Sequence, residues 1–114
     1  MFEKKLREDI LEEIEKVIHS RKQEMPDHSY VSALLHEGED QILKKISEEA
    51  CELILASKNK DDKNIIEESS DLIFHVLILL GVHDIPIAEI YNELKHRYKS
   101  PTENVATEDD DAAE

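Results

Sequence analysis

The chain has 114 residues and a formal net charge of −14, with 28 acidic and 14 basic residues. A chain of this length forms one domain at most and buries a modest share of its surface, so association with a second copy would help to complete its core. The acidic balance argues against a nucleic-acid-binding protein, which would carry a basic stripe to neutralise phosphates. A phosphate-bearing substrate would therefore need a metal ion or a few local cations to hold it.

The composition favours an all-α protein. There are only two glycines, three prolines and 4% aromatic residues, whereas strands would need more Val, Thr and aromatic residues and more frequent turns. The single cysteine, Cys51, excludes an intrachain disulfide and favours a reducing compartment. The longest apolar run, within residues 72–80, is too short to cross a bilayer. We therefore expect a cytoplasmic protein with neither a membrane nor a nucleic-acid partner.

Hydrophobic periodicity and helix-breaking residues predict four to five helices. Pro26 ends the first helix, because proline disfavours helical backbone at the residue before it. Gly38 is a plausible stop for the second helix, and Gly81 is expected to permit a turn after the fourth. Pro86 suits the first turn of the last helix. In chain order, the expected helices cover residues 2–22, 29–36, 39–58, 62–80 and 86–98.

The expected burial of these helices varies along the chain. The first helix carries an apolar face among charged residues, composed of Phe2, Leu6, Ile10, Ile14, Val17 and Ile18. The helix over residues 62–80 is apolar almost all the way round from Leu72 onward, so we expect it to be buried on most faces. Residues 100–114 are acidic and without periodicity. We interpret them as a disordered tail that follows an all-α domain of residues 1–99.

Two pairs of acidic residues lie on the two long helices. Glu49 and Glu52 are three residues apart on the helix over residues 39–58, and Glu68 and Asp71 have the same spacing on the next helix. Each pair falls on one stripe of its helix, and a short turn makes the two helices antiparallel neighbours. Facing carboxylates repel each other, and a hard divalent cation relieves that repulsion. Mg²⁺, or Mn²⁺ in its place, would suit these oxygen ligands and would suit phosphoryl transfer.

Other interpretations of these side chains stay open. Glutamates at such spacings, such as Glu48 and Glu52, are more often a solvated helix face. Asp71 favours a metal site, because its neighbours look buried and buried acids are rarely left unpaired. His75, one turn later, could orient a carboxylate, contact a substrate or be a satisfied core histidine. Lys45, and Lys44 less so, could counter phosphate charge, although exposed helix lysines usually bind nothing.

Three segments resemble a known family. They are Ser29-Tyr30-Val31, the string Lys44-Lys45-Ile46-Ser47-Glu48-Glu49-Ala50-Cys51-Glu52, and the string Asp71-Leu72-Ile73-Phe74-His75. Over about residues 5–98 the chain resembles the phosphoribosyl-ATP pyrophosphohydrolases of the MazG-like superfamily. The resemblance implies an all-α, MazG-like bundle whose core is completed by homodimerisation.

The resemblance also implies an activity, the Mg²⁺-dependent hydrolysis of phosphoribosyl-ATP to phosphoribosyl-AMP and pyrophosphate, the second step of histidine biosynthesis. The metal ligands that it implies are Glu49, Glu52, Glu68 and Asp71. We expect the catalytic residues to be Glu48, Glu49 and Glu52, and the substrate contacts to be Lys44, Lys45 and His75. The alternatives are a MazG-like pyrophosphohydrolase of other nucleoside triphosphates and a non-enzymatic helical interaction module.

Overall fold

The computed structural model describes the backbone of residues 2–98 and the side chains of residues 10–98. This part of the chain contains helices and no strand, so the prediction of an all-α protein is confirmed. The acidic tail predicted for residues 100–114 lies outside the described residues. In chain order the helices are α1 (Phe2–Glu24), α2 (Tyr30–Glu37), α3 (Glu39–Lys58), α4 (Asp62–Val82) and α5 (Ile87–Arg97).

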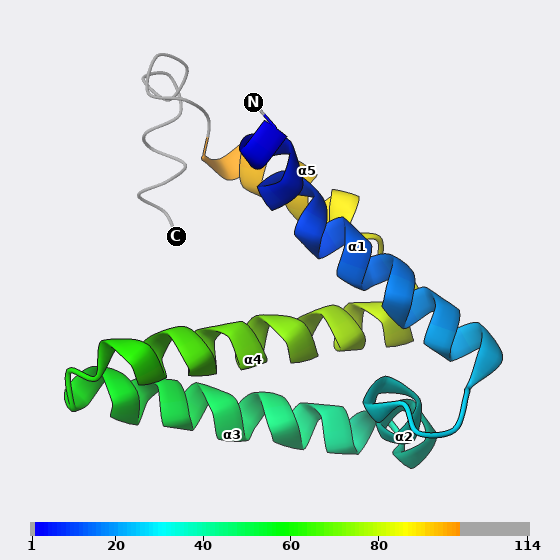
Figure 1. The fold of residues 1–114 in the computed structure, drawn as a ribbon, viewed down its shortest axis with the longest axis horizontal. Coiled ribbons are helices and arrows are strands. Elements are labelled where there is room, and N and C mark those ends of the chain that lie inside the picture. Colours follow the sequence, from blue (N-terminus) through cyan, green and yellow to red (C-terminus); the bar gives the residue numbers. More distant parts are fainter. Residues whose placement is uncertain (1, 99–114) are drawn as a thin grey trace.

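The helices α3 and α4 form an antiparallel hairpin and lie side by side along their length (Figure 1). The turn between them uses left-handed backbone at Lys60, with φ of 56°. Asp61 then caps α4, because its side chain accepts a hydrogen bond of 3.2 Å from the backbone N–H of Asn64. The predicted hairpin is therefore confirmed, and it places the acids of α3 opposite those of α4.

The short helix α2 is bounded by two local signals. The side chain of Ser29 accepts a hydrogen bond from the N–H of Ser32, which caps the start of the helix. At the other end Gly38 has φ of 107°, a conformation that glycine adopts without steric cost. The chain then turns directly into α3. Tyr30, the first residue of α2, thereby lies against α4 at His75.

The turn predicted after residue 80 begins two residues later, because α4 continues to Val82, and the N–H of Asp84 then donates to the carbonyl of Gly81 at 3.2 Å. A Cβ atom at Gly81 would lie only 2.8 Å from Cγ2 of Ile18 on α1. The glycine therefore serves the close approach of α1 to α4. Lys22 of α1 donates to the carbonyl of Gly81 at 2.9 Å and to the carboxylate of Asp84 at 2.7 Å, which places a cation at the end of α4.

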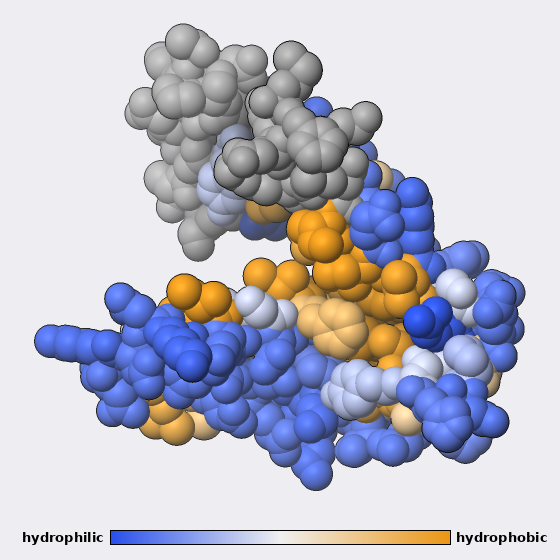
Figure 2. All heavy atoms as spheres, viewed as in Figure 1, coloured by the Kyte–Doolittle hydropathy of each residue, from blue (hydrophilic) through white to orange (hydrophobic). Residues whose placement is uncertain are grey.

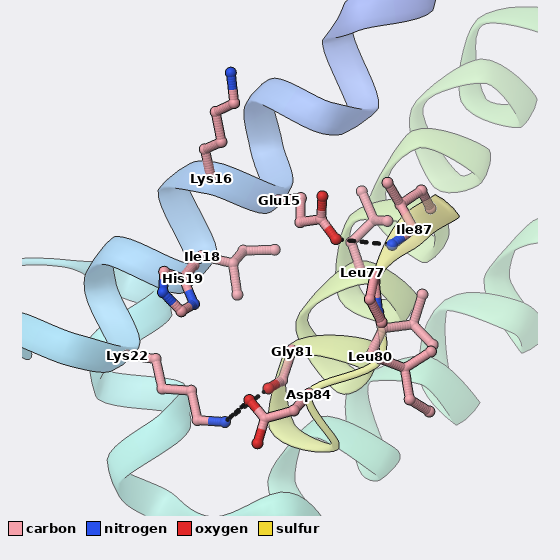
Figure 3. Close-up of a pocket in the computed structure, with 12 residues that line it drawn as sticks. Glu15, Lys16, Ile18, His19, Lys22, Leu77, Leu80, Gly81, Asp84 and Ile87 are labelled. Carbon is pink, nitrogen blue, oxygen red and sulfur yellow. Dashed lines mark hydrogen bonds and ion pairs between the residues drawn. The ribbon is translucent and has the colours of Figure 1, made fainter. Parts of the chain in front are cut away.

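The last helix, α5, begins after Pro86, which makes no side-chain cap hydrogen bond. A cap comes instead from α1, because Glu15 accepts a hydrogen bond of 2.7 Å from the N–H of Ile87 (Figure 3). A carboxylate at this position also meets the positive end of the α5 dipole. The start of α5 is thus attached to the middle of α1, and the two helices run close together (Figure 1).

The hydrophobic core is small and lies where α1, α2, α3 and α4 meet, and Ile87 at the start of α5 belongs to it. Its fully buried large side chains, among the described residues, are Ile18, Ile42 and Ile78. Of the predicted apolar face of α1, Ile18 is buried, whereas Ile10 and Val17 are exposed in the single chain. The burial expected of α4 on most faces from Leu72 onward is confirmed, because only Ile73 and Val76 of this stretch are exposed in the single chain. Figure 2 shows hydrophobic surface along the side of α4 that faces away from α3.

No single helix in the described part of the chain is long and apolar enough to span a bilayer. The helices α4 and α5 would satisfy that requirement only when taken together, and they are bent by 113° at the break between them.

Candidate active site

Acidic side chains from both helices of the hairpin gather around Glu68 of α4. The pKa of Glu68 is raised above its ordinary value of 4.5, first because burial disfavours the charged form. Hydrogen bonding and charge repulsion from Glu52 raise it further, and the charges of Asp71 and Glu49 add to the effect. The structure therefore places Glu49, Glu52 and Asp71 close enough to Glu68 to act on its charge.

Glu49 and Glu68 are partly buried, whereas Glu52 and Asp71 are exposed. The side chain of Glu49 is 12% exposed, and Oε1 of Glu49 and Oε1 of Glu68 are buried without a hydrogen-bond partner. The expectation that Asp71 is the buried acid is thus wrong, and the argument from burial applies to Glu49 and Glu68 instead. A carboxylate oxygen removed from water without a donor is costly, and a nearby cation offsets that cost.

The four acids fit a hard divalent cation by their chemistry and by these two unpartnered oxygens. As the side chains lie, however, no three His, Cys, Asp or Glu residues of the described part of the chain converge closely enough to hold an ion. Coordination would therefore require carboxylates to rotate towards a common point. Since Glu52 and Asp71 are exposed, their side chains have space for such a rotation.

His75 lies one turn after Asp71 on α4 and is buried next to Glu49. Its Nδ1 is 2.9 Å from the backbone carbonyl oxygen of Asp71, to which it is hydrogen-bonded, and 2.7 Å from Oε1 of Glu49. Its Nε2 is 2.7 Å from the hydroxyl of Tyr30. Both nitrogens are therefore occupied by groups of the protein itself. A contact of His75 with the substrate stays a prediction.

Tyr30 is the residue of this site to which sequence reasoning assigned no role. Its ring stacks on Phe74 with a centroid distance of 6.5 Å, and its edge meets His75 at 5.7 Å. The pKa of Tyr30 is raised above 10.0, first by burial and then by the charges of Glu49 and other acids, while Lys45 opposes the shift. The phenol is therefore protonated at neutral pH. The only signal in the sequence is the segment Ser29-Tyr30-Val31, which carries part of the resemblance.

The predicted basic and catalytic residues of α3 differ in their exposure. Lys45 is half-buried and close enough to Tyr30 to lower the pKa of its phenol. Lys44 and Glu48 are exposed. The roles expected for these three residues stay predictions.

A cavity of about 440 Å³ lies elsewhere, between α1, the end of α4 and the start of α5 (Figure 3). Its walls include Ile18, Leu77 and Leu80, with Lys22 and Glu15 at the edge. None of the acids Glu49, Glu52, Glu68 and Asp71 lines this cavity. The largely apolar cavity and the acid cluster are therefore separate features of the molecule.

Comparison with known proteins adds a family match. The model of a family described as phosphoribosyl-ATP pyrophosphohydrolase matches residues 11–98. The phosphoribosyl-ATP pyrophosphatase of Geobacter sulfurreducens is 48% identical over 92 residues, which cover 81% of this chain and 85% of that protein. The enzyme of the same name from Neisseria gonorrhoeae is 46% identical, over 79% of this chain and 84% of its own length.

A third relative is longer than this chain. The bifunctional histidine biosynthesis protein of Bacillus subtilis is 43% identical over 89 residues, which cover 78% of this chain and 43% of that protein. The segment that the family model matches contains the whole of the α3–α4 hairpin and Tyr30.

Proposed function

Because the chain belongs to the phosphoribosyl-ATP pyrophosphohydrolase family, we propose that it hydrolyses phosphoribosyl-ATP to phosphoribosyl-AMP and pyrophosphate with the help of Mg²⁺. The observation that carries this proposal is the group of four acids on the α3–α4 hairpin, with two buried carboxylate oxygens that lack a partner. Such a group suits a substrate whose reacting part is a triphosphate, since a metal ion can bridge carboxylates and phosphates.

Glu49, Glu52, Glu68 and Asp71 would hold the ion. When bound, Mg²⁺ supplies neutralisation of phosphate charge and a lowered pKa of coordinated water. A water molecule attacks the α-phosphorus, a new P–O bond forms, and the bond from that phosphorus to the bridging oxygen breaks to release pyrophosphate. Glu48 is our candidate to accept the proton of the water, and Lys45 is our candidate to counter the phosphate charge.

The activity assay compares the unaltered protein with two matched variants. Glu52→Gln removes a charged ligand with almost no change in shape, and we expect turnover to fall by at least about a hundredfold. Glu67→Gln removes the charge of an exposed neighbour of Glu68 and should leave turnover nearly unchanged. The measurement is the release of pyrophosphate and phosphoribosyl-AMP from phosphoribosyl-ATP and Mg²⁺.

Two outcomes of this assay would contradict the proposal. One is the absence of pyrophosphate release from phosphoribosyl-ATP by a folded protein in the presence of Mg²⁺. The other is faster hydrolysis of canonical nucleoside triphosphates than of phosphoribosyl-ATP, which would favour a MazG-like enzyme of different specificity.

We also propose that the active protein is a homodimer. Large apolar side chains of the hairpin are exposed in the single chain, with 66% of the surface of Ile66 and 62% of that of Ile54 accessible. The radius of gyration, 16.7 Å, exceeds the value of about 13 Å typical of a compact chain of this length. A second copy of the chain would cover these exposed apolar helix faces and complete the core.

A further inference from the structure

A short series of contacts connects the first residue of α2 to the acid cluster. The hydroxyl of Tyr30 is 2.7 Å from Nε2 of His75, and Nδ1 of the same ring is 2.7 Å from Oε1 of Glu49. Nδ1 also bonds to the backbone carbonyl oxygen of Asp71 at 2.9 Å. Both groups next to Nδ1 are acceptors, so the proton of the neutral imidazole belongs on Nδ1. Nε2 is then the acceptor, and the Tyr30 hydroxyl donates to it.

We propose that Tyr30 and His75 are positioning residues for Glu49: the Tyr30 hydroxyl adds to the preference for the Nδ1–H form of the His75 ring, and the protonated edge of that ring holds the Glu49 carboxylate at the acid cluster. The inference rests on the proposed function, because Glu49 is one of the proposed Mg²⁺ ligands. Partners behind a metal ligand orient it for the ion, and their loss weakens metal affinity.

The packing around His75 supports a fixed ring orientation. The side chain is 6% exposed, and its ring meets Phe74 edge to face at a centroid distance of 5.5 Å and an angle of 78°. Tyr30 meets the same ring at 83°. An imidazole packed against two aromatic rings and bonded at both nitrogens is restricted to one orientation, which keeps Nδ1 beside Glu49.

The position of Glu49 supports the same inference. Its Oε1 is buried without a hydrogen bond of its own, although Nδ1 of His75 is only 2.7 Å away. The N–H of Nδ1 is directed at the carbonyl of Asp71, and Glu49 lies to one side of it. The ring therefore stabilises the negative charge of Glu49 without forming a hydrogen bond to Oε1. That oxygen remains available for a ligand bond.

The first experiment measures the tautomer of His75, which does not depend on metal or turnover. In the unaltered protein without metal, at a pH at which the His75 ring is neutral, nitrogen NMR of the histidine rings should show His75 as the Nδ1–H form. Tyr30→Phe removes only the donor to Nε2 and keeps the aromatic ring, so the Nε2–H form should gain population. An unchanged tautomer in Tyr30→Phe, or an Nε2–H form in the unaltered protein, would overturn the inference.

The second experiment measures Mg²⁺ affinity by calorimetry. It uses two substitutions of His75, each of which retains a polar group near the position of only one of the two ring nitrogens. His75→Asn keeps an amide nitrogen near the position of Nδ1, whereas His75→Gln reaches the position of Nε2 and leaves Glu49 without its neighbour. We expect His75→Gln to bind Mg²⁺ about tenfold more weakly than the unaltered protein, with His75→Asn and Tyr30→Phe affected less. Circular dichroism establishes that each variant is folded.

His83→Asn is the matched control, because His83 also pairs with a glutamate, at 2.6 Å from Glu39, but away from the acid cluster. Its Mg²⁺ affinity should equal that of the unaltered protein. Equal affinities for His75→Gln, His75→Asn and the unaltered protein would overturn the inference while the proposed function stands. No Mg²⁺ binding by the unaltered protein would overturn both the metal site and the positioning role.

Discussion

The carboxyl group of Glu68 on α4 meets that of Glu52 on α3, and burial together with this neighbour raises the pKa of Glu68. The side chains come from the two arms of one hairpin, and the fold holds them together although their charges repel. Charge repulsion of this kind is common at ligand-binding sites, because residues that are arranged to bind a ligand often lower the stability of the unliganded protein. It also leads to measurable consequences.

The first prediction concerns Glu68→Gln in the presence of a chelator. Since the folded chain holds the Glu68 proton more tightly than the unfolded chain, its contribution to stability is present below the ordinary pKa of 4.5 and is lost as the pH rises through the raised pKa. The side chain of Gln does not titrate, so the Glu68→Gln variant does not lose stability in this way as the pH rises. We therefore expect it to melt a few degrees above the unaltered protein at pH 7, with the difference vanishing near pH 4. Thermal denaturation across this pH range is the measurement.

The control for this prediction is Glu67→Gln, whose side chain is exposed and whose substitution should not alter the melting temperature at either pH. A Glu68→Gln protein that is less stable at pH 7, or a difference that does not depend on pH, would contradict the prediction.

The second prediction concerns stabilisation by Mg²⁺. An ion that binds only the folded chain stabilises it by about 2.7 kcal/mol at a hundred times its dissociation constant. We expect Mg²⁺ to raise the melting temperature of the unaltered protein and to leave that of Glu68→Gln nearly unchanged. Differential scanning calorimetry with and without Mg²⁺ measures this, and a sodium chloride series of matched ionic strength distinguishes specific binding from screening. Equal responses to both salts would contradict a specific site.

The third prediction concerns Gly81, where an added Cβ would lie 2.8 Å from Cγ2 of the buried Ile18. Alanine favours a helix over glycine by about 1 kcal/mol, but overpacking of a rigid contact costs about 1–3 kcal/mol. We expect Gly81→Ala to lower the free energy of unfolding by about 1 kcal/mol, as the difference between these effects. Chemical denaturation is the measurement.

A double-mutant cycle supplies the control for Gly81. Ile18→Ala removes the atom that clashes, so Gly81→Ala should be neutral or stabilising when it is made in that background. If the two effects simply add, the contact between α1 and α4 is not the reason for the glycine.

The fourth prediction concerns the proposed dimer. Ile66 is exposed in the single chain, so Ile66→Glu would have little effect on a monomer, where surface substitutions change stability by about 0.5 kcal/mol or less. In a dimer that covers this helix face, the buried charge should shift the protein to a monomer. Light scattering measures the mass, and Asn64→Glu, which adds the same charge at an exposed polar position, is the control. A monomeric unaltered protein would contradict the prediction.

The sequence by itself determined the helices, because they depend on local signals. Apolar spacing, the caps at Ser29 and Asp61, and Gly38 act within a few residues of the helix they bound. The acid pairs were also evident from the sequence, because residues three apart share a face of a helix and a short turn forces two helices into contact.

Only the tertiary structure decided which of these acids is buried and what supports it. Glu49 and Glu68, rather than Asp71, have the unpartnered buried oxygens, because burial depends on how α3 and α4 rotate against each other. Tyr30 reaches His75 across 45 residues of chain, and Gly81 meets Ile18 across the crossing of α1 and α4. Helix periodicity carries no information about such contacts, which arise from packing between segments far apart in the sequence.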